Sequence, residues 1–283
     1  MKRFNWSALL TALGFAACQS GTRENHVPEL LPIPHEVHNI IAGTWYQSDY
    51  IEELAITRSP TQTKKGLGPY VELTIPPTGE LDTATTAAGN NNHEIEEFTI
   101  FFRPGLGPNT LRTEIPGEIG SRYELAYRIT DKDTAIELIL YDQTNKVVES
   151  RKYRRGPRGE TEPFNLMVNI SALAGLYDRF DSSGNKSLVE FRENGKIRGL
   201  PGCRDYQVIT DFVADPGLEF DEVCFNLTKP DQLCLSFRFH GDTLRLCELI
   251  EDESNETVKT GAQRFELVRH STSPGLRLRS AKP

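Results

Sequence analysis

Residues 235–246 have the sequence Leu-Ser-Phe-Arg-Phe-His-Gly-Asp-Thr-Leu-Arg-Leu, in which apolar and polar side chains alternate on both sides of Gly241-Asp242. Successive side chains of a strand point to opposite faces, so this alternation is typical of strands with one buried and one solvated face. A glycine-containing turn between two such runs favours a hairpin. The stretch therefore predicts antiparallel β-structure.

Alternating segments of the same kind recur through the second half of the chain, for example at 188–191 and 206–212. Turn-forming residues separate them, namely Ser183-Gly184-Asn185, Asn194-Gly195, Asp215-Pro216-Gly217, Lys229-Pro230-Asp231 and Gly241-Asp242. About eight strands are thereby predicted between 173 and 270, at the spacing of roughly 8–12 residues found in barrels and sandwiches. The first half repeats the plan with long polar insertions, and no segment shows a clear helical stripe.

Three short segments of the first half have counterparts, in the same order, in the second half. The matched segments are 40–46 with 172–177, 73–81 with 189–197, and 127–134 with 237–243. Shared hairpin patterns alone would produce similar matches, but the common order favours an internal duplication. We therefore expect an all-β fold of two tandem antiparallel β-barrels of about eight strands each. The expected parts are a barrel at 39–153, a linker at 154–168, a second barrel at 169–270 and a tail at 271–283.

The N-terminal segment carries the pattern of an export signal. Lys2 and Arg3 precede an apolar run that ends in Ala-Ala before Cys18. The run is too short for a membrane-spanning helix, which needs about 20 residues, and it predicts a signal peptide at 1–17. The polar segment at 18–38 contains several prolines and predicts an extended tether.

Ala16-Ala17-Cys18 resembles the lipobox of bacterial lipoproteins, although Phe15 stands where that motif usually has leucine or valine. The resemblance implies that Cys18 is acylated and anchors the protein in a bacterial cell envelope. Two or more acyl chains hold a protein stably on a membrane without a spanning helix. Because Gln19 is not the aspartate that often retains such proteins at the inner membrane, the outer membrane is favoured. The alternative is an ordinary cleaved signal followed by an incidental cysteine.

The charge balance of the chain is acidic, with 32 lysines and arginines against 40 aspartates and glutamates and a formal net charge of -8. Nucleic-acid binding needs a basic face that displaces counterions from phosphates, so no nucleic-acid partner is expected. The expected partners are the membrane, through acylated Cys18, and a small hydrophobic ligand. Nothing in the sequence identifies a protein partner.

Ala42-Gly43-Thr44-Trp45, together with an Asn-Gly turn and a late Asp-Thr-Leu strand, resembles small bacterial lipocalin-like domains. These belong to the calycin class of eight-stranded antiparallel barrels, and the resemblance implies a barrel in each half. The second half departs from the pattern at Gly175-Leu176-Tyr177, where tyrosine replaces tryptophan. It also resembles the META-type domain of exported bacterial proteins at 195–197 and 202–206, with Arg204 in place of that family's asparagine. Neither family implies a catalytic residue.

Four further cysteines all lie in the second half. They are Cys203, Cys224, Cys234 and Cys247. An even number in an exported domain favours two disulfides, with buried free thiols as the alternative. A zinc site is not expected, because the chain has no Cys-x-x-Cys spacing.

The pairing of these cysteines depends on two turns. A loop centred between Val213 and Ala214 places Cys203 opposite Cys224. A hairpin that turns at His240-Gly241 places Cys234 opposite Cys247. A turn one residue later leaves Cys234 and Cys247 diagonal and too far apart for an unstrained bridge. The expected disulfides are 203–224 and 234–247.

The sequence shows little that indicates catalysis. His35-Glu36-Val37-His38 lacks the spacing of a His-Glu-x-x-His zinc site, and there is no nucleophile elbow, phosphate loop or calcium loop. We therefore expect no enzyme activity, no cofactor and no metal, and no ligand-binding residue can be assigned. The predicted function is a lipid-anchored binding protein for a small apolar or amphipathic ligand. The alternative is a structural or envelope-assembly protein with filled barrels, and the volume of the interior distinguishes the two.

Overall fold

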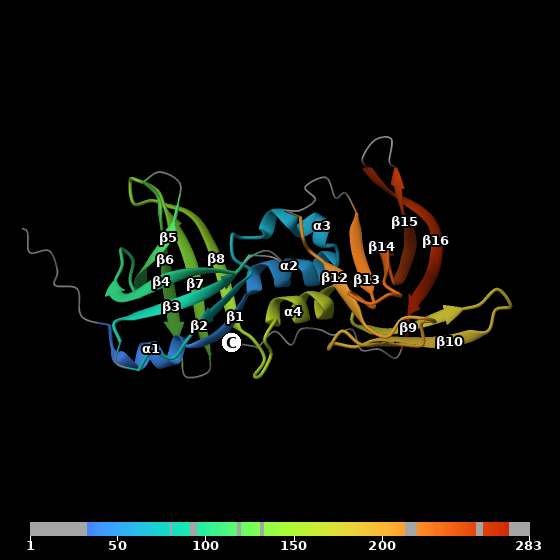
Figure 1. Cartoon of the computed structure of the whole chain (residues 1–283), viewed down its shortest axis with the longest axis horizontal. Coiled ribbons are helices and arrows are strands. Elements are labelled where there is room, and N and C mark those ends of the chain that lie inside the picture. The colour runs from blue at the N-terminus through green and yellow to red at the C-terminus, as the bar shows by residue number, and fades with distance from the viewer. Residues whose placement is uncertain are drawn as a thin grey trace, which may run out of the picture. The chain divides into compact units, whose positions relative to one another are not determined.

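The computed structural model describes residues 33–79, 81–90, 95–117, 120–130, 133–212, 220–252 and 257–271. These residues are mainly β and contain two eight-stranded antiparallel sheets, here called sheet A and sheet B (Figure 1). The predicted β-rich fold is confirmed at this level. The expected signal peptide, Cys18, most of the tether and the tail from residue 272 lie outside the described residues.

Sheet A is a closed barrel formed by the first half of the chain. Its strands are β1 (Gly43–Gln47), β2 (Glu72–Ile75), β3 (Thr83–Gly89), β4 (Ile95–Pro104), β5 (Thr110–Pro116), β6 (Arg122–Ile129), β7 (Thr134–Tyr141) and β8 (Val147–Arg155). Each strand pairs with the next, and β8 pairs back to β1 through Trp45 and Arg155. Strand β8 extends past residue 153, so the first residues of the predicted linker, Arg154 and Arg155, are part of the barrel wall.

Large buried side chains line the core of sheet A. Trp45, Ile100 and Tyr153 are completely buried there, together with inward-facing residues from the other strands. Helix α1 (His35–Ile41) adds Val37 and Ile41 to the same core. This helix begins inside the segment predicted to be an extended tether, which corrects that expectation. A small barrel of eight strands has room for side chains or for one small ligand, and in sheet A large side chains project into the core.

Sheet B contains the remaining strands but is not closed. They are β9 (Gly175–Phe180), β10 (Lys186–Phe191), β11 (Ile197–Arg198), β12 (Tyr206–Ile209), β13 (Asp221–Phe225), β14 (Leu233–His240), β15 (Thr243–Asp252) and β16 (Thr257–Arg269). The edge strands β11 and β12 are joined only by an isolated bridge between Lys196 and Asp205. The backbone N–H of Val208 in β12 instead donates to the Asn169 side chain. The second closed barrel is therefore not found, because strand β11 is short and a helix satisfies the edge of β12.

Helices also occur within the described residues, contrary to the expectation of no helical segment. Besides α1, they are α2 (Ser48–Thr57), α3 (Pro60–Thr63), the 3-10 turn η1 (Lys64–Gly66) and α4 (Pro163–Ala172). Helix α4 crosses the predicted boundary between linker and second barrel. Its buried residues Phe164, Val168 and Ala172 recur every four positions, which is the spacing of one helix face. Pro163 stands in the first turn, where its missing N–H costs no helical hydrogen bond.

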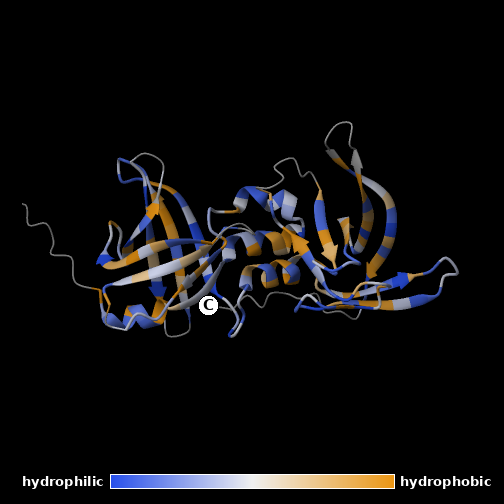
Figure 2. Ribbon diagram, in the orientation of Figure 1, coloured by the Kyte–Doolittle hydropathy of each residue, from blue (hydrophilic) through white to orange (hydrophobic). Residues whose placement is uncertain are grey.

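Helices α2 and α4 share a hydrophobic core with sheet B. Leu54 of α2 and Val168 of α4 are completely buried, in the same cluster as Tyr177, Phe225 and Leu235 of sheet B. Figure 2 shows hydrophobic positions along both helices and, in alternation with hydrophilic ones, along the strands. Helix α2 belongs to the connection between β1 and β2, so the first half of the chain completes the core of the second. Residues 32–283 accordingly form one compact unit.

Each half opens with the same local arrangement. The indole Nε1 of Trp45 donates to the carbonyl oxygen of Ile41 at 2.9 Å, and the hydroxyl of Tyr177 donates to the carbonyl oxygen of Leu173 at 2.8 Å. In both cases the acceptor lies four residues earlier, where a helix ends before the first strand of the sheet.

The last strand of each sheet completes this arrangement with an arginine. Arg155 lies opposite Trp45 in the β1–β8 pair, and its guanidinium is 4.5 Å from the indole ring centre. Arg269 lies opposite Tyr177 in the β9–β16 pair. The predicted match between 40–46 and 172–177 thus corresponds to equivalent positions in the two halves.

Glu72 connects sheet A to helix α4. Its carboxylate accepts a hydrogen bond of 2.7 Å from the backbone N–H of Phe164, in the first turn of that helix. Burial, together with the nearby carboxylates of Glu162 and Glu160, raises the pKa of Glu72 from 4.5 to about 7, against the lowering effect of the Phe164 hydrogen bond. Between these two pH values the folded protein binds more protons than the unfolded chain. Its stability therefore falls as the pH rises through this range.

Glu72→Gln is expected to remove this pH dependence. The amide oxygen still accepts from Phe164 and carries no charge to desolvate, so the variant should melt at a higher temperature than the native protein above pH 7. The difference should shrink towards pH 4.5, and thermal melts across this range measure it. Glu97→Gln, at an exposed position of β4, is the control. An unchanged pH profile in Glu72→Gln would contradict the assignment.

Candidate functional site

The structure joins Cys224 of β13 to Cys234 of β14 by a disulfide and leaves Cys203 and Cys247 as free thiols. Neither predicted pairing is found. Cys224 is instead opposite Gln207 on one side and opposite Cys234 on the other. The β14–β15 hairpin turns at Gly241-Asp242, which is the register predicted to keep Cys234 and Cys247 apart. Strand register therefore decided the pairing.

Cys224→Ser is expected to lower the free energy of unfolding by about 2–3 kcal/mol, because the bridge closes a short loop in the unfolded chain. The stability of this variant should no longer respond to reductant. Cys247→Ser, which removes a free thiol, should remain sensitive to reductant. Peptide mapping of the unreduced protein checks the bond, and a linked peptide that contains Cys203 or Cys247 would contradict it.

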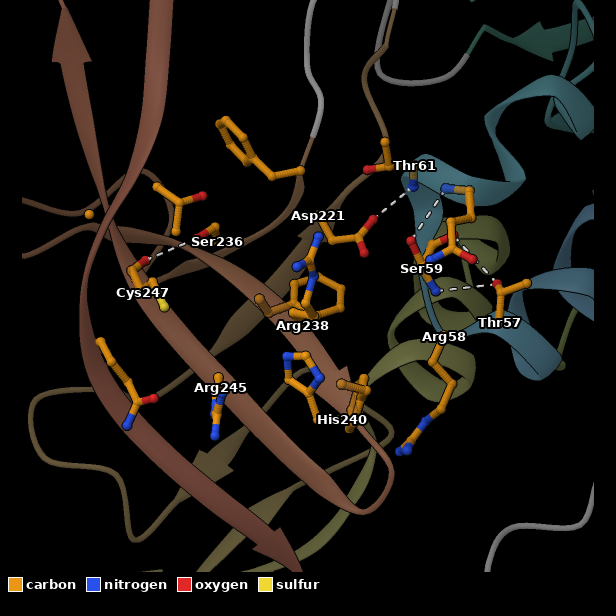
Figure 3. Close-up of a pocket in the computed structure, with 17 residues that line it drawn as sticks. Thr57, Arg58, Ser59, Thr61, Asp221, Ser236, Arg238, His240, Arg245 and Cys247 are labelled. Carbon is orange, nitrogen blue, oxygen red and sulfur yellow. Dashed lines mark hydrogen bonds between the residues drawn. The ribbon is translucent and has the colours of Figure 1, made fainter.

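A pocket of about 530 Å³ lies where the end of α2 and helix α3 meet strands β13–β16 (Figure 3). Its lining residues are Thr57, Arg58, Ser59, Thr61, Gln62, Phe220, Asp221, Ser236, Phe237, Arg238, Phe239, His240, Arg245, Cys247, Thr260, Gly261 and Gln263. The lining thus combines phenylalanine rings with hydroxyl, amide and charged groups, and more of the charged groups are basic than acidic.

The register of the β14–β15 hairpin determines which polar groups meet in the pocket. Ser236, Arg238 and His240 alternate along β14 and therefore share one face of the strand. Arg238 is directly opposite Arg245 of β15. Phe237 points to the other face, where it belongs to the core of sheet B. The hairpin thus sets Arg238 and Arg245 opposite each other at the pocket.

These basic groups are only partly neutralised. Arg245 forms an ion pair of 3.0 Å with Glu266 of β16. Among the described residues, Arg238 and His240 have no ion-pair partner. The pocket carboxylate of Asp221 accepts a hydrogen bond of 2.8 Å from the backbone N–H of Thr61. The pocket therefore carries an excess of positive charge.

Arg58 contributes a further guanidinium from the residue that caps α2. Its backbone adopts a left-handed conformation with φ of 56°, and its N–H bonds to the carbonyl of Leu54. The guanidinium lies 3.7 Å from the ring centre of Phe239 and donates to the hydroxyl of Tyr177 at 3.4 Å. Burial lowers the pKa of Arg58, and the neighbouring Tyr177 opposes that effect. Arg58 therefore joins the first half of the chain to the wall of the pocket.

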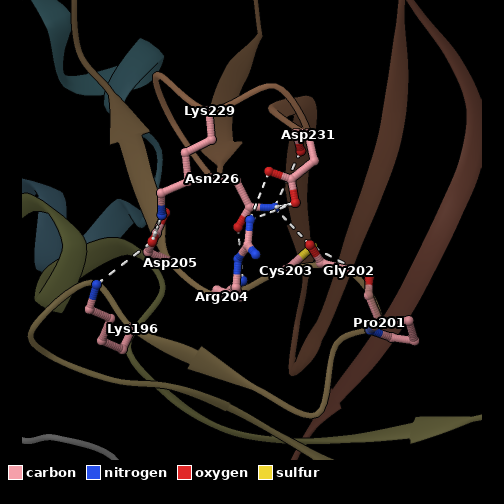
Figure 4. Close-up of polar contacts among 9 residues, drawn as sticks. All are labelled: Lys196, Pro201, Gly202, Cys203, Arg204, Asp205, Asn226, Lys229 and Asp231. Atoms are coloured by element: carbon pink, nitrogen blue, oxygen red, sulfur yellow. Dashed lines mark hydrogen bonds and ion pairs between the residues drawn. The ribbon is translucent and has the colours of Figure 1, made fainter.

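A separate polar cluster surrounds the loop at 201–205, which precedes β12 (Figure 4). The buried Asn226 side chain donates to the carbonyl of Gly202 at 2.7 Å and accepts from the backbone N–H of Arg204 at 3.0 Å. The guanidinium of Arg204 pairs with Asp231 at 2.6 Å. Asn226 thus fastens the loop before β12 to the turn after β13.

The same cluster contains the bridge between the edges of sheet B. Asp205 forms an ion pair with Lys229 and another, of 3.7 Å, with Lys196 (Figure 4). Lys229 and then Lys196 lower the pKa of the Asp205 carboxyl. Since these charges are paired with one another, we assign the cluster a role in holding the sheet together.

The histidine motif in the first half is structural. His38 is buried on α1, and its ring stacks on Phe102 with 3.5 Å between the ring centres. Burial, with a smaller contribution from His35, lowers the pKa of His38. Within the described residues, the group with metal-ligating spacing consists of Glu222, Cys224 and Cys234. Its two cysteines form the disulfide, so they are not available as thiolate ligands.

The sequence did not identify the pocket residues Arg58, Arg238, His240 and Arg245. For the three on the hairpin, a signal exists, since a turn at Gly241-Asp242 sets Arg238 opposite Arg245. Arg58 has no such signal, because its place depends on packing between the two halves. No protein-family model, curated protein or solved structure matches the chain. No helix within the described ranges has the length and apolarity needed to cross a bilayer.

Proposed function

We propose that the protein is a lipid-anchored extracytoplasmic binding protein, and that a small amphipathic ligand occupies the pocket beside β14 and β15. The observation that carries this proposal is the pocket itself. Its volume of about 530 Å³ lies within the range of roughly 300–1,000 Å³ that is usual for small-molecule sites. Its lining offers phenylalanine rings for an apolar part and fixed polar groups for a polar end.

The large side chains in the core of sheet A favour the pocket over the barrel as the ligand site. Ligand-binding barrels of eight strands keep space at their centre, whereas Trp45, Ile100 and Tyr153 occupy this one completely buried. The same observation supports a structural role for the first half, which is the second candidate function. In that case sheet A and its helices would serve to support sheet B on the envelope.

The proposed anchor is Cys18, through the lipobox-like sequence that ends in this residue. Acylation there would place the folded part on the outer face of a bacterial membrane, with the outer membrane favoured. A closed antiparallel barrel of eight strands that begins with Gly-Thr-Trp supports the resemblance of the first half to lipocalin-like domains. The open sheet B supports it less directly.

Native mass spectrometry of the purified chain with Cys18→Ser, which removes the proposed anchor, tests for a bound ligand. We expect a population heavier than the polypeptide by the mass of a small molecule, which an organic extraction releases. The extract should restore the heavier population when added back. A protein that carries no molecule as purified and takes up none from an extract of envelope lipids would favour the structural candidate.

A further inference from the structure

We propose that the pocket of sheet B selects its ligand by an acidic head group, a phosphate or a carboxylate, held between the guanidinium groups of Arg238 and Arg245. The proposal rests on the proposed function for the apolar part of the ligand. The acidic head group is inferred separately, from the arrangement of charges on the hairpin.

Arg238 and Arg245 are directly opposite each other in the β14–β15 hairpin. Cβ atoms of cross-strand partners lie about 4.5–5.5 Å apart, and like charges at such a position destabilise the sheet. An anion between the two side chains converts this repulsion into two attractive contacts. Guanidinium groups are suited to the role, because their planar N–H pairs match the oxygen spacing of phosphate and carboxylate.

The described residues supply too little negative charge to neutralise the basic groups of the pocket. Glu266 pairs with Arg245, but Arg238 and His240 have no acidic partner among the described residues. Asp221 is the carboxylate that lines the pocket, and its contact is with the backbone of Thr61. The chain as a whole is acidic, so this local excess of positive charge is not a consequence of composition.

The apolar part of the ligand would contact Phe220. This residue lines the pocket immediately before β13, and the β13–β14 register, extended by one residue, places it opposite Arg238 on the face that Arg238 shares with Arg245. The ring of Phe239 points to the other face of β14, where Arg58 covers it. An alkyl chain beside Phe220 would continue from a head group held by Arg238 and Arg245. The site thus suits an amphiphile whose charged end and apolar chain are adjacent.

Titration calorimetry at low salt with octyl phosphate, 1-octanol and inorganic phosphate tests the proposal. We expect octyl phosphate to bind at least about tenfold more tightly than 1-octanol, since a charge-assisted hydrogen bond accounts for a factor of this order. Arg238→Gln should weaken octyl phosphate by about tenfold or more and leave 1-octanol unchanged. Arg198→Gln, on the exposed edge strand β11, is the matched control and should bind as the native protein does.

The stability of the unliganded variant separates recognition from a structural effect. Because Arg238→Gln removes a like-charge contact, its melting temperature without ligand should equal or exceed that of the native protein, while the shift caused by octyl phosphate becomes smaller. A lower melting temperature without ligand, with an unchanged shift, would contradict the proposal.

The three probes separate failure of this inference from failure of the proposed function. Equal binding of octyl phosphate and 1-octanol, unaffected by Arg238→Gln, would contradict recognition of an acidic head group. It would leave the proposed function, binding of an amphipathic ligand, in place. Inorganic phosphate that binds as tightly as octyl phosphate, in an Arg238-dependent manner, would support the anion site and overturn the amphiphile. No binding of any probe would overturn both.

Discussion

Leu54→Ala is expected to destabilise sheet B, although Leu54 belongs to the first half of the chain. Its side chain is 0% exposed and lies in the core that α2 and α4 share with the strands of sheet B. Truncation of a fully buried leucine costs about 2–5 kcal/mol, from lost burial and from the cavity left behind. Against a typical domain stability of about 5–15 kcal/mol, this is a large fraction.

Urea unfolding and hydrogen exchange measure this effect. The midpoint should fall in Leu54→Ala, and the amides of β12–β15 should lose protection together with those of α2. Ile56→Ala is the matched control, because Ile56 lies on the same helix and is 84% exposed. It should change the stability by less than about 0.5 kcal/mol. A Leu54→Ala protein in which sheet B keeps its protection would show that the two halves are independent.

Cys18→Ser is expected to release the protein from membranes completely. Two or more acyl chains account for stable attachment, so their loss leaves a chain with nothing comparable to hold it. Fractionation of envelopes and metabolic labelling with a palmitate analogue measure this effect. Cys247→Ser, at a free thiol in sheet B, is the control and should stay attached and labelled. Label that persists in Cys18→Ser would contradict acylation at this residue.

The strand content could be predicted from the sequence because it depends on local alternation. The segment 235–246 forms the hairpin expected of it, and the first half closes into the expected barrel. Helix α2 was missed because it has only Tyr50, Ile51 and Leu54 as buried apolar residues, in one and a half turns. Helix α4 has a longer row of buried apolar residues on one face, but it was missed because the segment was expected to be a linker.

The open edge of sheet B could not be predicted, because it depends on contacts between distant segments. Asn169 meets Val208 only after α4 packs against β12, and no local pattern in either segment indicates that contact. The disulfide depended on register in the same way. In the β12–β13 pair, Gln207 and not Cys203 lies opposite Cys224, and Cys234 of β14 is its disulfide partner.

The candidate site was missed for a related reason. Residues that alternate outward from a half-buried strand are normally solvated, so Arg238 and Arg245 did not stand out in the sequence. They become candidates for a binding site because the hairpin register sets them opposite each other, and because Arg58 from the first half of the chain lines the same pocket. Each of these contacts requires the assembled core.

Hydrogen–deuterium exchange with and without octyl phosphate tests the central claim most directly, because it shows where a ligand binds. We expect slower exchange in β14 and β15 around residues 236–247 and at the end of α2, no change in β1–β8, and loss of the effect in Arg238→Gln. Protection confined to sheet A, or protection of residues 236–247 that persists in Arg238→Gln, would contradict it.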